Sequence, residues 1–376
     1  KSGAGRHRFF GFFRLCKGIA MFVILLALCI YALGLVCTAV GSRLAGRCTT
    51  WCCALLGLPL WVVGGTVVPF CLALPQLTLA FQAAGLSLTS IAVGAALAGS
   101  VTNLGLALAV CLLRPQAATV HRGEFTRKCA LLLAACATVT LFVRDGKLSY
   151  TGTGILMALF VFFVLQSIVY QYNAADGTEQ EPISTDGAAD APAESYTAGT
   201  MSFPAMGVFN SLKNLSGVVL GMVLLGIGAQ ALAYSAITFA NLTGTIQALW
   251  ASTLVSFGFC LPLLADVLDH PLGSIWKKFA LKCRFFPPDT LPMQLLNSAI
   301  LNLTLALPVS GLMYRQRLPI ADQYRSYDIP LCAVMALVLL LPPLLRKRLY
   351  RWQGAVCLVL YGFYLAAVLL APRAGA

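Results

Sequence analysis

A twelve-residue phrase occurs twice in this chain, each time as an apolar stretch with a proline inside it. The first copy is TVVPFCLALPQL at 66–77 and the second is TLVSFGFCLPLL at 253–264, with six identities in register. A shorter echo follows each copy, NLGLAL at 103–108 and NLTLAL at 302–307. Interrupted helices at corresponding places in two halves of a chain are typical of the binding site of a membrane transporter. The duplication therefore predicts an internally repeated membrane protein.

The composition agrees with this interpretation. Hydrophobic residues make up 59% of 376 positions, charged residues 10%, and the mean hydropathy is +0.84, well above what a soluble domain needs. A spanning helix takes about 20 mostly apolar residues, and ten stretches qualify. We expect an all-α polytopic protein in a lipid bilayer, with spans near 18–40, 52–80, 89–113, 129–143, 150–172, 216–240, 245–268, 293–313, 329–345 and 354–370.

A polar segment divides these ten spans into five and five. Residues 173–196 carry six of the thirteen acids and almost no bulky apolar side chains, a composition that does not bury enough surface to order itself. We expect a first five-helix repeat over 1–172, with its duplicated core at about 61–113. An acidic, disordered linker over 173–215 and a second repeat over 216–376, with its core at about 245–313, follow. Five spans per repeat force the two copies to insert in opposite orientations.

The net charge of +13 does not indicate nucleic-acid binding, because the basic residues lie in short clusters beside the spans. Alternating sides place fifteen Lys and Arg with the linker and eleven with the N-terminus, which favours an inside linker. The membrane could be plasma, endomembrane or mitochondrial inner membrane, and homo-oligomers are left open. The chain begins at Lys1, which leaves room for an upstream signal peptide.

The residues typical of metal sites and of enzymes are not arranged for either role. Fourteen cysteines are scattered without a CxxC pair, and the three histidines lie in predicted loops. A zinc site, a disulfide framework and a cofactor are therefore not expected, apart from transported cations such as Ca²⁺ or Na⁺. No Ser/His, Cys/His, paired-acid or HExxH arrangement reaches the spans, so an intramembrane enzyme is the least supported function.

The repeated motifs resemble those of the calcium/cation antiporter superfamily, whose second and third spans read roughly G-[TN]-S-x-P-[ED] and G-S-N-I-F-N in each repeat. The corresponding segments here are CLALPQ at 71–76, GFCLPL at 258–263, AGSVTN at 98–103 and NSAILN at 297–302. Segments at 114–118, 142–147 and 170–172 look most similar to the mitochondrial-type sodium/calcium exchanger branch. The resemblance implies a ten-helix fold of two inverted repeats and exchange of Ca²⁺ or another cation against Na⁺ or H⁺.

The family's carboxylate ligands are missing. In the family, the acid after each motif proline supplies oxygens for the ion, but these positions hold Gln76 and Leu263 here. Of the acids outside the linker, we expect only Asp266 to lie within a span. It is either a displaced ion ligand or a residue at the end of a span among the headgroups. Without carboxylates, dehydrating a divalent cation is very unfavourable.

What remains at the motif positions is a set of neutral oxygens and two helix breaks. Carbonyl groups that a proline frees can hold Na⁺ in transporters, whereas Asn, Ser and Thr can also serve as bonds between helices. The predicted ion-binding residues are Thr66, Pro75, Gln76, Ser100, Thr102, Asn103, Thr253, Pro262, Asp266, Ser298 and Asn302.

Two functions remain in contention. The first is a secondary cation transporter that works by alternating access around a site in spans two, three, seven and eight. The second is a transport-deficient member of the same family that acts as a regulatory or assembly subunit, because both motif acids are lost.

Overall fold

The computed structural model describes residues 3–55, 66–114, 120–175, 182–183, 208–268, 291–346 and 349–370. Within these ranges, nine helical stretches are long and apolar enough to cross a membrane. The prediction of a polytopic helical membrane protein is thus confirmed. The second expected span, near 52–80, is only partly described, since residues 56–65 fall outside these ranges.

The first half of the chain forms five helical stretches, one of which consists of consecutive α-helical and π-helical elements. In order they are α1 (Gly3–Leu55), α3 (Val68–Gly85), α4 (Thr89–Thr102) continued by the π-helical η2 (Asn103–Leu108) and by α5 (Ala109–Leu113), α6 (Arg122–Phe142) and α7 (Tyr150–Ala175). Two short strands flank α6, namely β1 (Val120–His121) and β2 (Lys147–Leu148).

The second half repeats this order. It comprises α8 (Val208–Thr243), α9 (Gln247–Trp250) continued by η3 (Ala251–Val255) and α10 (Ser256–Leu268), then α12 (Leu291–Leu301) continued by η5 (Asn302–Ala306) and α13 (Leu307–Tyr314), and finally η6 (Tyr324–Asp328), α14 (Ile329–Arg346) and α15 (Arg351–Leu370). Of the strands, β4 (Leu318–Pro319) pairs antiparallel with β2, and β3 (Pro182–Ile183) pairs antiparallel with β1. The helix α7 ends at Ala175 and α8 begins at Val208, so both extend into the interval 173–215 in which the linker was expected.

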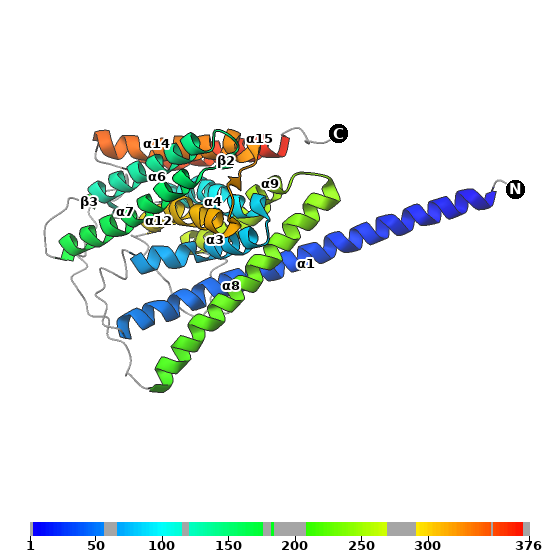
Figure 1. Cartoon of the computed structure of the whole chain (residues 1–376), viewed down its shortest axis with the longest axis horizontal. Helices are drawn as coiled ribbons and strands as arrows, with labels where there is room; N and C mark the ends of the chain where they lie inside the picture. The colour runs from blue at the N-terminus through cyan, green and yellow to red at the C-terminus, as the bar shows by residue number, and fades with distance from the viewer. Residues whose placement is uncertain are drawn as a thin grey trace.

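The two longest helices, α1 and α8, cross each other beside the remaining helices, as Figure 1 shows in blue and green. They share the most extensive contact between any two elements. A Cβ built at Gly221 of α8 would lie 2.6 Å from the backbone nitrogen of Ala45, and one at Gly41 of α1 would lie 2.8 Å from the Gly221 oxygen. Only glycine permits such an approach, so small residues bring the helices together, as they commonly do in membranes.

The centre of the molecule is α4, which is buried along almost its whole length. Its sequence, TSIAVGAALAGSVT, consists mainly of small residues, which let α3, η3, α10 and η5 pack closely around it. A Cβ at Gly94 would lie 2.6 Å from both the Ala251 Cβ and the Tyr324 hydroxyl oxygen. The helix that carries one copy of the repeated motif is therefore enclosed by the elements that carry the other motifs.

Two spans begin earlier than the sequence predicted. The fourth of the ten expected spans is Gly123–Phe142 in the structure and the ninth is Tyr324–Leu345, whereas apolar composition alone placed their starts at residues 129 and 329. Each helix thus includes one polar turn that contains a buried acid, Glu124 in α6 and Asp328 at the end of η6. The expectation that only Asp266 among the acids outside the linker would lie within a span was wrong.

Candidate functional site

The repeated motifs mark departures from regular α-helix. Asn103 begins η2 and Asn302 begins η5, so the matched asparagines each open a π-helical segment. Thr253 lies in η3, and its counterpart Thr66 lies in a π-helical turn just before α3. Such π-helical turns within α-helices are rare and are frequent at functional sites. The internal duplication is therefore also a duplication of local backbone geometry.

Three of the helices bring side-chain amides together near the middle of α4. A Cβ built at Gly99 would lie 3.4 Å from Asn302 Nδ2 and 3.5 Å from Gln76 Cγ. Both side chains therefore lie against Gly99 of α4, Gln76 from α3 through its Cγ and Asn302 from η5 through its amide nitrogen. Asn103 is joined to this region because its Nδ2 donates to Ser298 Oγ at 3.1 Å. We call Gln76, Asn103, Ser298 and Asn302 the amide cluster.

The amide cluster has hydrogen-bonding groups that are buried and unused. Gln76 is 1% exposed and Asn103 and Asn302 are 0% exposed. Gln76 Oε1, Asn103 Oδ1 and both polar atoms of Asn302 have no hydrogen-bond partner within the described ranges. Leaving a buried polar group unpaired costs about 1–3 kcal/mol, so native proteins rarely leave several together without a reason. Four of the unpaired buried atoms within the described ranges thus lie together at the repeated motifs.

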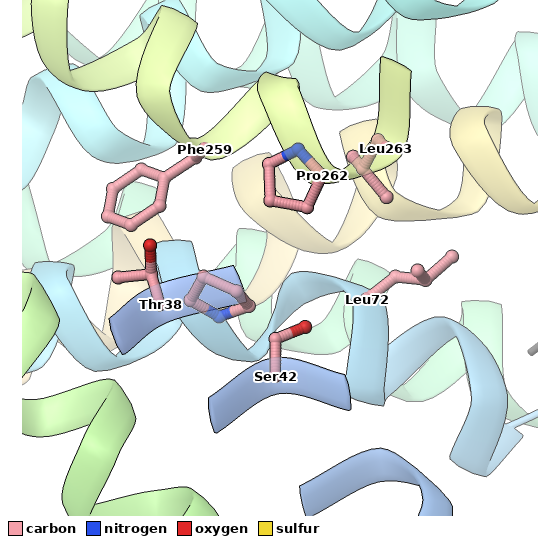
Figure 2. Close-up of a pocket in the computed structure, with 7 residues that line it drawn as sticks. Thr38, Ser42, Leu72, Phe259, Pro262 and Leu263 are labelled. Atoms are coloured by element: carbon pink, nitrogen blue, oxygen red, sulfur yellow. The ribbon is translucent and has the colours of Figure 1, made fainter. Parts of the chain in front are cut away.

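The two motif prolines meet at a small cavity on the other side of α3. Thr38 and Ser42 of α1, Leu72 and Pro75 of α3, and Phe259, Pro262 and Leu263 of α10 line it. Figure 2 shows the Thr38 and Ser42 side chains on the α1 side of this space, across from Phe259, Pro262 and Leu263. A volume of about 10 Å³ is near the lower limit for one water molecule. Because proline has no N–H, each break also frees a carbonyl one turn earlier, at Cys71 and Gly258.

The remaining predicted residues have more local partners. Ser100 Oγ lies 2.8 Å from the carbonyl oxygen of Ala96 and 3.1 Å from that of Ala299, so it joins α4 to α12. Thr253 is half-buried and bonds back to its own helix at Leu249. Thr102 bonds back to Ala98 and lies 3.5 Å from the Tyr361 hydroxyl.

Two other predicted residues, Thr66 and Asp266, lie on α3's leading turn and on α10. Thr66 is half-buried. Asp266 lies in the last turns of α10, and its side chain falls outside the described part of the chain. The structure thus brings Gln76, Asn103, Ser298 and Asn302 together, places Pro75 and Pro262 at the nearby cavity, and turns Thr102 toward α15.

The sequence analysis missed polar residues that share this interior. Asn297 opens the fourth motif segment, is 1% exposed and has an unpartnered Oδ1. Its position in this motif segment could have identified Asn297 from the sequence. Glu124 and Asp328 were missed because they precede the apolar stretches that marked the spans. Glu124 lies in the first turn of α6 and Asp328 at the end of η6, and each is followed by a buried apolar residue, Phe125 or Ile329.

The site itself carries no formal charge. Gln76 and Leu263 stand at the two positions where the resemblance implied carboxylates, and Leu263 is 8% exposed, which keeps it in the apolar core. Across the described ranges there is no group of three or more His, Cys, Asp or Glu side chains that could hold a metal ion. The arrangement offers amide, hydroxyl and backbone oxygens, which suit a singly charged cation better than a divalent one.

Known proteins resemble this chain in sequence along most of its length. The sequence profile described as "Sodium/calcium exchanger protein" matches residues 18–169 and 213–370. CaxA, a candidate antiporter of Alkalimonas amylolytica, is 24% identical over 303 residues, which cover 80% of this chain and 85% of CaxA. The inner membrane protein YrbG of Escherichia coli strain K12 is 24% identical over 217 residues, covering 57% of this chain and 62% of YrbG. Both relatives are bacterial, and neither supports the mitochondrial-type branch.

The fold is similar to that of a solved transporter. The sodium-calcium exchanger NCX_Mj, in a structure soaked with Na⁺ and Sr²⁺, aligns with a TM-score of 0.56 and 19% identity, covering 92% of this chain and 99% of that one. A structure of the same protein without Na⁺ and Ca²⁺ aligns with a TM-score of 0.55 and 18% identity. At this level of identity the likeness concerns the fold alone.

Proposed function

Because the chain belongs to the sodium/calcium exchanger family of membrane cation antiporters, we propose that it exchanges a singly charged cation at a site formed by neutral oxygens. The observation that carries this proposal is the amide cluster, in which Gln76, Asn103 and Asn302 are buried and have unpartnered polar atoms. The family membership makes the protein a multi-pass membrane transporter rather than an enzyme.

The chemistry of the ligands supports a monovalent ion. Calcium is held by six to eight oxygens, and carboxylates offset its charge. Amide and carbonyl oxygens offset none, and taking an ion out of water becomes more costly with its charge. Backbone carbonyls at helix breaks do coordinate Na⁺ in transporters. We propose Na⁺ as the first cation to test, with Gln76 and Leu263 in place of the missing acids as the reason that Ca²⁺ is not held.

The matched halves support alternating access. Each half contributes a helix with a proline inside it, α3 or α10, and a π-helical segment that begins with asparagine, η2 or η5. We propose that the halves are ten spans in two inverted repeats, which rock around the fixed site between them. The cavity between Pro75 and Pro262 lies against α1, and α1 with α8 then forms the part that opens and closes access.

Flux measurement tests this function. Purified protein in proteoliposomes is expected to show counterflow of at least one of Na⁺, K⁺, H⁺ and Ca²⁺ above protein-free liposomes. Asn302→Leu should abolish the counterflow, because it removes both unpartnered polar atoms. Ser310→Ala is the matched control, since Ser310 lies in the same span, is buried and bonds back to Ala306. Flux equal to that of protein-free liposomes for all four ions would refute the proposal.

A second function is favoured by one observation. Leu263 fills an acid position with a buried apolar side chain, as expected for a protein that keeps the fold but does not transport, and acts as a regulatory or assembly subunit. This alternative predicts that cysteines placed at Gln76 and Asn302 react equally with thiol reagents with and without each cation. Ion-dependent protection at either position would exclude it.

A further inference from the structure

Asp328 is a carboxyl group enclosed in the helical core, and no described residue forms an ion pair with it. It is the last residue of η6, lies within the ninth of the ten expected spans, which is Tyr324–Leu345 in the structure, and is 0% exposed. The Tyr364 hydroxyl of α15 donates a hydrogen bond to Asp328 Oδ1 at 2.8 Å. Asp328 Oδ2 has no hydrogen-bond partner among the described residues. An ionisable residue inside a membrane span is by default a functional candidate.

The buried acid of the first half, Glu124, pairs with a cation, whereas Asp328 pairs with none among the described residues. Glu124 Oε1 lies 2.5 Å from Lys128 Nζ, and both side chains are buried. Around Asp328, the groups that interact with it electrostatically are the phenols of Tyr324, Tyr361 and Tyr364 and the thiol of Cys332.

Cations do occur on these elements, but they are engaged elsewhere. Arg325 of η6 is exposed and donates a hydrogen bond to the Arg144 carbonyl oxygen, and Lys128 of α6 pairs with Glu124. The helix α6 contributes Cys136, which contacts Cys332, while α4 and η2 contain no acidic, basic or histidine residue. A carboxylate in such surroundings is very costly. The position is therefore suited to a mobile positive charge, and a proton is the one that needs no additional space.

Hydrogen bonds connect the surroundings of Asp328 to helices that form the candidate ion site. The Tyr361 hydroxyl, on the same helix as Tyr364, lies 3.5 Å from Thr102 Oγ1, next to Asn103 of the amide cluster. In η6, Tyr324 donates to the Ser90 carbonyl of α4 at 2.6 Å. A change at Asp328 would thus act on η6, α15 and α4 together.

A second connection leads from η6 to the seventh span. Gln323 Nε2, just before η6, donates to Ser252 Oγ of η3 at 2.8 Å. Ser252 is buried and lies in the π-helical segment that contains Thr253 and precedes α10. Asp328 therefore lies where the ninth span is fixed to both the third and the seventh spans.

We propose that Asp328 is the proton-binding site of this protein, and that proton uptake and release there are coupled to cation exchange at the amide cluster. This inference rests on the proposed function and names its coupling ion. The carboxylate accepts one proton at Oδ2 when the site is open to one side of the membrane, and the same proton leaves when it is open to the other. Asp328 thereby supplies the charge change that Gln76 and Leu263 cannot provide.

Two measurements test the proposal on the full-length protein. In proteoliposomes loaded with a pH-sensitive dye, imposed Na⁺ and K⁺ gradients should drive proton movement by the wild type. Asp328→Asn should reduce this proton movement to the level of protein-free liposomes. Asp322→Asn is the matched control, because Asp322 is an exposed acid just before η6, and it should move protons like the wild type.

Infrared difference spectra, recorded between acidic and alkaline buffer, should contain the C=O band of a buried carboxylic acid. The band should vanish in Asp328→Asn and persist in Asp322→Asn. Tyr364→Phe, which removes only the donor to Oδ1, should shift both the band and the pH dependence of proton flux. This variant provides the answer if Asp328→Asn does not fold.

The outcomes separate this inference from the proposed function. Cation counterflow without proton movement in the wild type, or proton movement unchanged in Asp328→Asn, would overturn the proton site and leave the transporter intact. An infrared band that persists in Asp328→Asn would also overturn it. Absence of all cation flux would contradict the proposed function instead, and the infrared band would still decide whether Asp328 binds a proton.

Discussion

Replacing Asn302 by leucine should stabilise the protein while abolishing its response to the transported cation. Asn302 is 0% exposed, and neither Oδ1 nor Nδ2 has a partner within the described ranges. Leucine has the same number and branching of side-chain heavy atoms, so it fills the same space without polar groups. Leaving a buried polar group unpaired costs about 1–3 kcal/mol. We therefore expect Asn302→Leu to raise the free energy of unfolding by about 1–3 kcal/mol in cation-free buffer.

Asn103 provides the comparison, because its amide is used. Its Nδ2 donates to Ser298 Oγ at 3.1 Å, and such a bond between membrane helices is worth about 0.6 kcal/mol. Asn103→Leu loses this bond while it removes one unpartnered oxygen, so its stability should stay close to that of the wild type. A bound cation should stabilise the wild type by about 2.7 kcal/mol at a concentration 100 times its Kd. Neither leucine variant should gain that increment.

The assay is thermal unfolding in detergent with a thiol-reactive fluorophore. Cys129, Cys260 and Cys332 are buried and free, and buried thiols react only after the structure opens. Each variant is measured without added cation and over a titration with Na⁺, K⁺ or Ca²⁺. If Asn302→Leu is less stable than Asn103→Leu, or if it keeps the wild-type cation response, the amide of Asn302 is a packing group and the reasoning fails.

Three further predictions use the same unfolding assay. Gly94→Ala places a methyl carbon 2.6 Å from the Tyr324 hydroxyl oxygen and should lower the free energy of unfolding by about 1–3 kcal/mol through overpacking. Adding Tyr324→Phe should restore part of this stability. A Gly94→Ala variant as stable as the wild type would show that α4 can shift. Glu124→Gln leaves Lys128 buried without its carboxylate partner and should lower the free energy of unfolding by about 3–5 kcal/mol. The double variant with Lys128→Met should recover most of this stability. A double variant as unstable as the single one would contradict the prediction. Gln76→Glu returns one carboxylate to the site and should introduce stabilisation by Ca²⁺ that the wild type lacks, and an unchanged Ca²⁺ response would count against the location of the site.

The fold could be predicted from the sequence because each membrane span is specified by the composition of its own stretch of residues. About 20 apolar residues in a row indicate a helix whatever its neighbours are, and nine described spans confirm this. The starts of α6 and η6 could not be predicted in the same way. Glu124 and Lys128 neutralise each other one turn apart, so the helix tolerates a charged turn that hydropathy places outside the membrane. A hydropathy average counts both charges as polar, but it contains no information on the ion pair that they form.

The amide cluster was predictable for a different reason. The duplicated phrase and its echo identify Gln76, Asn103 and Asn302, and the motif segment at 297–302 adds Ser298, without any knowledge of their contacts. Matched irregularities in two halves are improbable as coincidences of packing. Asp328 has no such phrase around it. Its importance depends on Tyr364, 36 positions later, and on the absence of a lysine where the first half has Lys128. The asymmetry between a paired acid in one half and an unpaired acid in the other appears only when α6 and η6 are compared in three dimensions. It gives the two halves different electrostatics within one architecture, which is what a carrier needs if its cation site is neutral and its coupling charge lies elsewhere.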